Sequence, residues 1–142
     1  MSSLYLAEPV RHALGDCLRP GGDTLTRRVL SVLDPDRDSN VLDAGCGPGG
    51  TLRLLEEAGY DNAVGIDADL GLLRDSSNIN ATAAADMMSL PFLSCCFDMV
   101  FCECAWNLTE KSQSLAEFHR VLKIGGHLAI SDVHRRKQAQ SG

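Results

Sequence analysis

The sequence predicts an α/β fold built on a doubly wound, mostly parallel sheet of about five strands with flanking helices. Three observations support this prediction. From residue 40 onward, short apolar segments alternate with amphipathic helical segments, which is typical of β-α-β units. A glycine-rich turn, GCGPGG, follows the first apolar segment. Acidic residues stand at or near the ends of three apolar segments, and such sheets bind ligands at the carboxyl ends of their strands.

The N-terminal part, residues 1–38, is predicted to form a helical cap. A helix through residues 25–33 places its leucine and valine side chains three or four positions apart, on one face. Asp23 or Thr24 can cap the start of this helix. The segment 34–36, Asp-Pro-Asp, is expected to end it, because the residue before a proline disfavours helical backbone.

Residues 39–134 are predicted to form the core of the fold, and residues 135–142 a polar tail. The five expected strands are short and mostly apolar, as strands in a buried parallel sheet are, and they cover residues 40–44, 63–67, 80–86, 97–104 and 126–133. Between them, amphipathic patterns predict helices at residues 51–58 and 69–75 and from Thr109 or Ser112 to Leu122, the last closed by Gly125-Gly126. Because such crossovers are right-handed, the arrangement is Rossmann-like.

Composition excludes several classes of protein. The chain has 142 residues, enough for one domain, with 44% hydrophobic and 23% charged residues. No apolar run approaches the roughly 20 residues of a membrane span, and the first residues lack the pattern of a secretory signal, so we expect a cytoplasmic protein that does not enter membranes. A net charge of -6 and only 5% aromatic residues argue against a nucleic-acid partner.

The glycine turn and its neighbouring acids predict a nucleotide-like ligand. Glycines let the backbone approach a ligand closely, and Asp67 follows Gly45 by 22 residues, where an acid can accept hydrogen bonds from ribose hydroxyls. Asp86 ends the third expected strand and is placed to accept from an adenine amino group. The turn also fits the dinucleotide fingerprint. However, the Asp43 carboxylate, two residues before the first glycine, would repel a pyrophosphate and suits a ligand with an ammonium group.

These segments together resemble a known family. VLDAGCGPGG is similar to the first motif of the class I S-adenosylmethionine-dependent methyltransferases, GIDAD to their second motif and AADMMSLPF to their third. FDMVFCECAWNL followed by LAEFHRVLKIGGHLAISDV resembles the fourth motif and fifth strand of the type 11 branch, which includes the ubiquinone and menaquinone biosynthesis methyltransferases. The resemblance covers about residues 40–133 and implies S-adenosylmethionine as cofactor and a small molecule as methyl acceptor.

The resemblance also implies roles for individual residues. The methionine part of the cofactor would lie on Asp43, Gly45, Cys46 and Gly47. The nucleoside part would contact Asp67 at the ribose and Ala68, Asp86 and Met87 at the adenine. Cys102 and Glu103 would lie near the sulfonium, and Trp106 and Asn107 would face the acceptor.

Methyl transfer from a sulfonium needs few catalytic groups. The sulfonium is a good leaving group, so the reaction depends mainly on proximity and orientation. A general base is needed only if the acceptor must lose a proton. Glu103 is the nearest candidate for this base, and His12 and His127 are weaker candidates.

The six cysteines are interpreted as free thiols that serve mostly as small buried side chains. Cys102 and Cys104, two residues apart, could form half of a metal or arsenic site. However, Cys95 and Cys96 are adjacent and so do not supply a second pair at the spacing of metal ligands. We therefore predict no metal site.

The pattern departs from the family at its C-terminal end. The family core has seven strands, and only five can be placed here, so residues 128–130 would lie on an unpaired edge strand, which favours association. We expect a homodimer. Besides a methyltransferase, the sequence leaves open a non-catalytic cofactor-binding or regulatory subunit and an NAD-dependent oxidoreductase fragment.

Overall fold

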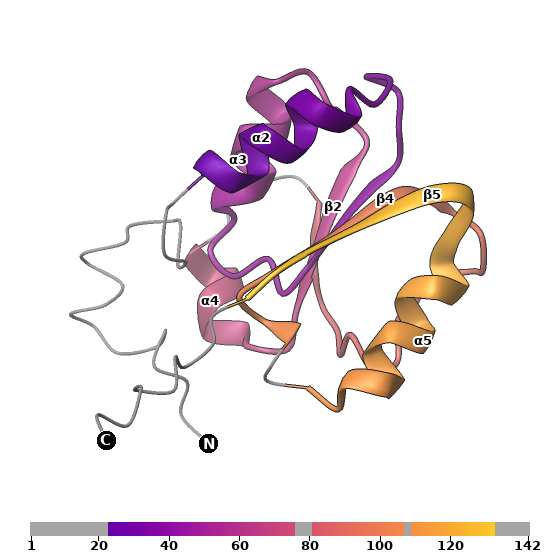
Figure 1. The fold of residues 1–142 in the computed structure, drawn as a ribbon. Coiled ribbons are helices and arrows are strands. Elements are labelled where there is room, and N and C mark those ends of the chain that lie inside the picture. The colour runs from indigo at the N-terminus through magenta and orange to yellow at the C-terminus, as the bar shows by residue number, and fades with distance from the viewer. Residues whose placement is uncertain (1–22, 76–80, 107–108, 133–142) are drawn as a thin grey trace, which may run out of the picture.

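A computed structural model describes residues 23–75, 81–106 and 109–132. They form one parallel sheet of five strands in the order β3-β2-β1-β4-β5, flanked by helices (Figure 1). Along the chain, the elements are α2 (Thr24–Leu33), β1 (Val41–Ala44), α3 (Gly50–Glu57), β2 (Ala63–Asp67), α4 (Leu70–Asp75), β3 (Thr82–Ala84), β4 (Phe97–Glu103), α5 (Lys111–Val121) and β5 (Leu122–Ser131). The predicted fold class is confirmed.

The sheet is covered on both faces, as a doubly wound fold requires. On one face, Leu30 of α2 and leucines of α3 pack against Val41, Met99 and Phe101 of the sheet. On the other face, Phe118 of α5 packs in a second cluster with side chains of β1, β2 and β4. Figure 1 shows α2 and α3 on one side of the sheet and α5 on the other.

The central strand β1 explains where a ligand can bind. All four of its residues are buried, and it pairs in parallel with β2 on one side and β4 on the other. Asp43 lies opposite Gly65 of β2 and Phe101 of β4. The chain turns back from β3 to β4 across this strand, so strand order reverses at β1. Ligands of open α/β sheets bind at such a switch point.

The start of β5 differs from the prediction. We expected Gly125-Gly126 to close the preceding helix, but α5 ends at Val121 and β5 begins at once with Leu122, which pairs with Phe97. The two glycines lie inside β5, where the pairing with β4 shifts register between Phe97 and Met99. Gly125 has φ +81°, a left-handed conformation, so the pair forms an irregularity in the strand instead of a helix stop.

Two smaller predictions are also corrected. The third strand covers residues 82–84, and Asp86 already begins the following turn, in which its carbonyl oxygen accepts from the N–H of Ser89. The last helix is capped by Glu110 and not by Thr109 or Ser112. The Glu110 carboxylate accepts hydrogen bonds from the backbone N–H groups of Ser112 and Gln113.

Among the described residues, no helix is long and apolar enough to cross a membrane.

Candidate functional site

The glycine turn after β1 is held against the end of β2. The backbone N–H groups of Gly45 and Cys46 both donate to the carbonyl oxygen of Ile66, at 2.8 and 2.9 Å. Gly45 has φ +79°, and a Cβ placed on it would lie 2.5 Å from the Cβ of Ala105. Only glycine fits there, because a side chain would force the turn away from the segment after β4.

Asp67, at the end of β2, holds the same turn with its side chain. One carboxylate oxygen accepts from the N–H of Gly47 at 2.9 Å, and the other accepts from the N–H of Asp69 at 2.8 Å. Burial raises the pKa of Asp67, and the two backbone hydrogen bonds oppose this shift. A carboxylate offers about four acceptor positions, so Asp67 can hold the turn and still accept from a ligand hydroxyl.

Asp43 places a buried carboxylate at the base of the turn. Its residue is only 3% exposed. Burial raises the pKa of the Cys46 and Cys102 thiols, and the negative charge of Asp43 adds to the rise at both. Both thiols therefore stay protonated and are poor nucleophiles. Nearby negative charge and soft apolar atoms suit a ligand with ammonium and sulfonium groups.

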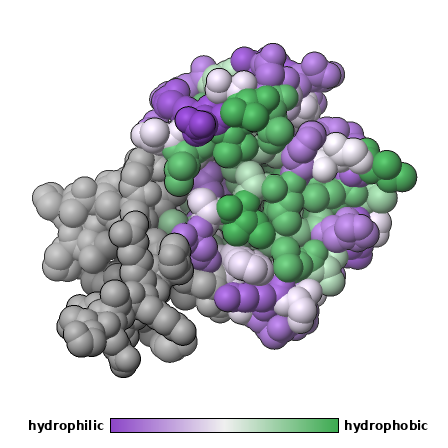
Figure 2. All heavy atoms as spheres, in the orientation of Figure 1, coloured by the Kyte–Doolittle hydropathy of each residue, from purple (hydrophilic) through white to green (hydrophobic). Residues whose placement is uncertain are grey.

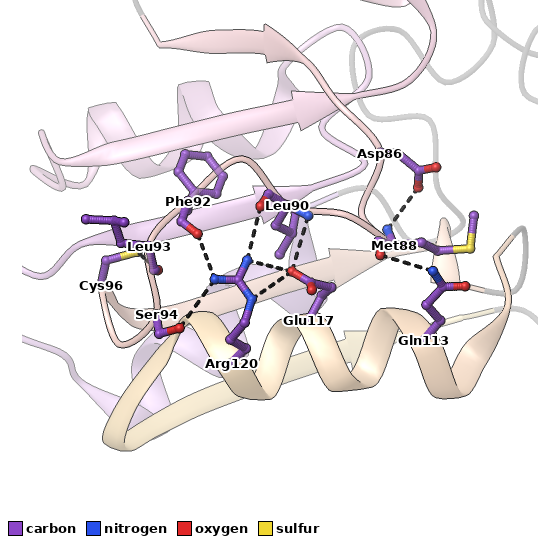
Figure 3. Close-up of polar contacts among 10 residues, drawn as sticks. All are labelled: Asp86, Met88, Leu90, Phe92, Leu93, Ser94, Cys96, Gln113, Glu117 and Arg120. Carbon is purple, nitrogen blue, oxygen red and sulfur yellow. Dashed lines mark hydrogen bonds and ion pairs between the residues drawn. The ribbon is translucent and has the colours of Figure 1, made fainter.

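Met87 completes one wall of this region. Its sulfur lies 3.9 Å from the Cys102 sulfur, and its methyl carbon would be 3.3 Å from a Cβ on Gly45. Met87 is buried, whereas its neighbour Asp86 is exposed and accepts from the N–H of Met88 at 2.9 Å. Asp86 belongs to the segment between β3 and β4, residues 85–96. Figure 3 shows Asp86 at the end of this segment that is farther from Arg120. Ala68 follows Asp67 and is also exposed.

Glu103 lies at the end of β4 and is bound by two helices. Its carboxylate oxygens accept from the Thr26 hydroxyl of α2, at 2.8 and 2.9 Å, and one also accepts from the Thr51 hydroxyl of α3 at 3.4 Å. Neither threonine was among the residues predicted to form the site. A signal was present for Thr26, because a polar residue at the centre of the apolar face of a helix needs a buried partner. Glu103 also lines a groove with Leu25, Thr26, Val29, Phe101, Ala129, Ile130 and Ser131.

Trp106 follows the end of β4 and is half-buried, with the Lys111 ammonium 5.1 Å from its ring centre. Its indole N–H is buried and has no hydrogen-bond partner among the described residues. Two other predicted residues, Asn107 and His12, lie outside the described residues. His127 pairs with Met99, four residues before the end of β4, which places it about 13 Å along the strand from Glu103.

The contacts therefore bring most of the predicted cofactor residues together at one end of the sheet. Hydrogen bonds, packing or charge link seven of these residues to one another: Asp43, Gly45, Cys46, Gly47, Asp67, Met87 and Cys102. Ala68 and Asp86 are exposed, and they are the immediate chain neighbours of Asp67 and Met87. Within the described residues, no group of three or more metal-ligating side chains is found.

Comparisons with known proteins identify the family to which the chain belongs. The methyltransferase domain family matches residues 42–130. A malonyl-[acyl-carrier protein] O-methyltransferase from Pseudescherichia vulneris is 34% identical over 108 residues, which is 72% of this chain and 42% of that protein. A demethylmenaquinone methyltransferase from Corynebacterium urealyticum is 37% identical over 109 residues, 75% of this chain and 46% of that protein. This chain thus spans less than half the length of these two relatives.

Solved structures share the fold. The crystal structure of MccD protein superposes with a TM-score of 0.74 at 24% identity, covering 86% of this chain and 58% of that chain. The family match favours a methyltransferase over the oxidoreductase fragment that the glycine turn alone left open. The chain belongs to the class I S-adenosylmethionine-dependent methyltransferases, in the methyltransferase domain family that matches most of its sheet.

Proposed function

We propose that this chain binds S-adenosylmethionine at the carboxyl ends of β1, β2 and β4 and transfers its methyl group to a small-molecule acceptor. The main observation behind this proposal is that two carboxylates lie beside the same glycine turn. Asp67 accepts from the N–H of Gly47, and buried Asp43 is the next-to-last residue of the neighbouring strand β1. These groups match a ligand that combines ribose hydroxyls with a positively charged amino acid.

Each part of the cofactor has a partner in this arrangement. Asp43 and the Gly45–Gly47 backbone would hold the methionine part, and Asp67 would accept from the ribose hydroxyls. Asp86 would accept from the adenine amino group, with Met87 against the ring. When bound, S-adenosylmethionine supplies an electrophilic methyl group on a sulfonium. Burial and the charge of Asp43 raise the pKa of the Cys46 and Cys102 thiols, so these two thiols stay protonated and are poor nucleophiles toward that methyl.

The acceptor is proposed to lie beyond the end of β4, near Trp106 and Asn107. The indole N–H of Trp106, which has no hydrogen-bond partner in the described part of the chain, is a donor that an acceptor oxygen or nitrogen can use. For an acceptor that must lose a proton, Glu103 is the proposed general base. The Thr26 and Thr51 hydroxyls hold its carboxylate in one position, and a fixed position is what a general base needs.

We also propose that the protein is a cytoplasmic homodimer with no nucleic-acid partner. The net charge of -6 supports the last point, since phosphate binding needs a basic surface. The dimer is supported by the edge of the sheet at β5, where Figure 2 shows apolar atoms gathered over β5 and α2. Leu25, Ile124 and Leu128 are all exposed in this region.

Calorimetric titration with S-adenosylhomocysteine, the product form of the cofactor, tests the binding proposal. We expect a dissociation constant of roughly micromolar for the unchanged protein. Asp67→Ala should weaken binding at least about tenfold, since hydrogen bonds to charged groups contribute roughly 1.5–3 kcal/mol. The matched control is Asp61→Ala, which removes an exposed carboxylate two residues before the start of β2, at the end of the strand opposite Asp67.

Two outcomes would overturn the proposal. One is the absence of binding heat for the folded, unchanged protein at concentrations well above micromolar. The other is equal affinity for the Asp67→Ala and Asp61→Ala variants. Incubation of the protein with cell extract and labelled cofactor then tests transfer, since a labelled small molecule would identify the acceptor.

A further inference from the structure

The segment between β3 and β4, residues 85–96, is held to the fold by one side of α5. This segment contains no helix or strand, so its backbone groups need partners elsewhere. The Arg120 guanidinium supplies several of them (Figure 3). It donates to the carbonyl oxygen of Phe92 at 2.8 Å and to that of Leu90 at 3.1 Å, and more weakly to the Ser94 hydroxyl at 3.4 Å.

Glu117 fixes the orientation of that guanidinium. Its carboxylate accepts from two nitrogens of Arg120, at 2.6 and 3.0 Å, and also from the backbone N–H of Leu90 at 3.2 Å. The pair is partly shielded, with side chains 34% and 22% exposed for Arg120 and Glu117. Leu90 therefore has both its N–H and its carbonyl oxygen bound by the same ion pair, and its side chain is buried in the core.

A third contact extends this support toward the cofactor site. Gln113, one turn before Glu117 on the same face of α5, donates to the carbonyl oxygen of Met88 at 3.4 Å. Asp86 and Met88 belong to one tight turn, in which the N–H of Met88 donates to the Asp86 side chain and the N–H of Ser89 to the Asp86 carbonyl oxygen. Leu90 follows this turn directly, so the position of Leu90 limits where the turn can lie.

We propose that Glu117 and Arg120 are positioning residues for the adenine end of the cofactor. They touch neither the glycine turn nor Asp67 in any contact described above. They act by holding residues 88–94 on α5, which fixes the turn that presents Asp86 to the adenine amino group and Met87 to its ring. This inference rests on the proposed function and adds to it the residues that set selectivity for the base.

Selectivity for the base separates this role from simple support of the fold. A residue that only stabilises the fold would weaken binding of all nucleoside ligands to the same extent. A residue that positions Asp86 should instead affect the preference for adenine over hypoxanthine, in which a carbonyl replaces the amino group. Such a carbonyl cannot donate to the Asp86 carboxylate.

The experiment measures the affinity of S-adenosylhomocysteine and of its hypoxanthine analogue by calorimetry. The test variants are Arg120→Lys, which keeps the charge but loses the planar fork that reaches two carbonyl oxygens, and Glu117→Gln. The matched control is Lys123→Met, which breaks a similarly exposed ion pair with Asp98 that lies outside this segment. Hydrogen exchange of peptides from residues 85–96 is measured on the same proteins without ligand.

We expect the unchanged protein and the Lys123→Met variant to prefer adenine by about tenfold or more. Arg120→Lys and Glu117→Gln should reduce that preference at least threefold and speed exchange in residues 85–96, but not in β1. An unchanged preference in both variants overturns the inference, as does unchanged exchange. If the unchanged protein binds neither ligand, the proposed function itself fails, and the inference falls with it.

Discussion

Burial and hydrogen bonding have opposite effects on the protonation of the Asp67 carboxyl group. Its side chain is half-buried, and this partial burial favours the neutral form and raises its pKa. Its proposed ligand donates hydroxyl hydrogen bonds, which favour the charged form. The two backbone N–H groups of Gly47 and Asp69 already support the charged form before any ligand arrives. At this residue, protonation and cofactor binding are therefore linked.

This linkage predicts a pH dependence of cofactor affinity. Because ligand hydroxyls bind best to the ionised carboxylate, affinity should fall as pH drops below the raised pKa of Asp67 in the free protein. The fall should begin above the ordinary aspartate range of about 3.9 and approach a tenfold loss for each pH unit. Calorimetry from pH 7 downward, with circular dichroism to confirm folding, measures it.

The Asp67→Asn variant serves as the control for this dependence. It keeps the size of the side chain and cannot ionise, so its weaker affinity should change little over the same range. If the variant and the unchanged protein lose affinity in parallel, another group causes the dependence, and the role of Asp67 would be contradicted.

For single residues, the sequence predicts a place in the site where that place follows from local geometry. Asp43 and Asp67 lie at the carboxyl ends of the paired parallel strands β1 and β2, so their proximity follows from the parallel sheet. The partners of Glu103 could not be predicted in the same way. Thr26 lies 77 positions away in the chain, and its contact depends on how α2 packs on the sheet, which no local pattern specifies.

The helices act as fixed supports for this end of the sheet. α2 meets β4 through the Thr26 hydroxyl and Glu103, and α3 adds the Thr51 hydroxyl. Thr26 is almost fully buried, at 1% exposed. The carboxylate therefore draws hydrogen bonds from the two helices on one face of the sheet, close to where β4 ends.

Removing the Thr26 hydroxyl should destabilise the protein. Thr26→Val keeps the shape of the side chain but removes the hydroxyl that donates to the carboxylate of Glu103, at a cost of about 1–3 kcal/mol. Thr26→Ser should restore most of that loss, since it restores the donor. Urea unfolding measures the free energy of unfolding for each variant.

Thr24→Val is the control, because Thr24 lies on the exposed side of the same helix. A loss of equal size in the Thr24 and Thr26 variants would show that the effect comes from helix propensity. The contact with Glu103 would then contribute nothing measurable to stability.

The boundary between α5 and β5 shows why element limits are harder to predict than elements. The amphipathic pattern correctly predicted the last helix, and apolar residues correctly predicted the last strand. A Gly-Gly pair fits a helix end and a strand irregularity equally well. The choice is made by pairing, since Leu122 already lies beside Phe97 three residues before Gly125.

At the scale of the whole molecule, strand order follows from the alternation of strands and helices, whereas the edges of the sheet do not. Among the described residues, no strand pairs with β5 on the side away from β4. The residues of β5 are exposed or half-buried throughout. An exposed edge with apolar side chains can pair with another chain.

We expect the protein to sediment as a dimer in analytical ultracentrifugation. Leu128→Glu should shift it toward the monomer, because the charge would be buried in an interface formed at β5. Leu93→Glu is the control, since Leu93 is 83% exposed but belongs to the segment between β3 and β4. A monomer in the unchanged protein, or an equal shift in both variants, would contradict an interface at β5.

The most direct test of the whole account is a crystal structure of the protein with S-adenosylhomocysteine. We expect ribose hydroxyls within hydrogen-bond distance of the Asp67 carboxylate, the amino acid part on the Gly45–Gly47 backbone beside Asp43, and the adenine against Met87. A ligand bound in a different place, or in this place with the ribose away from Asp67, would contradict it.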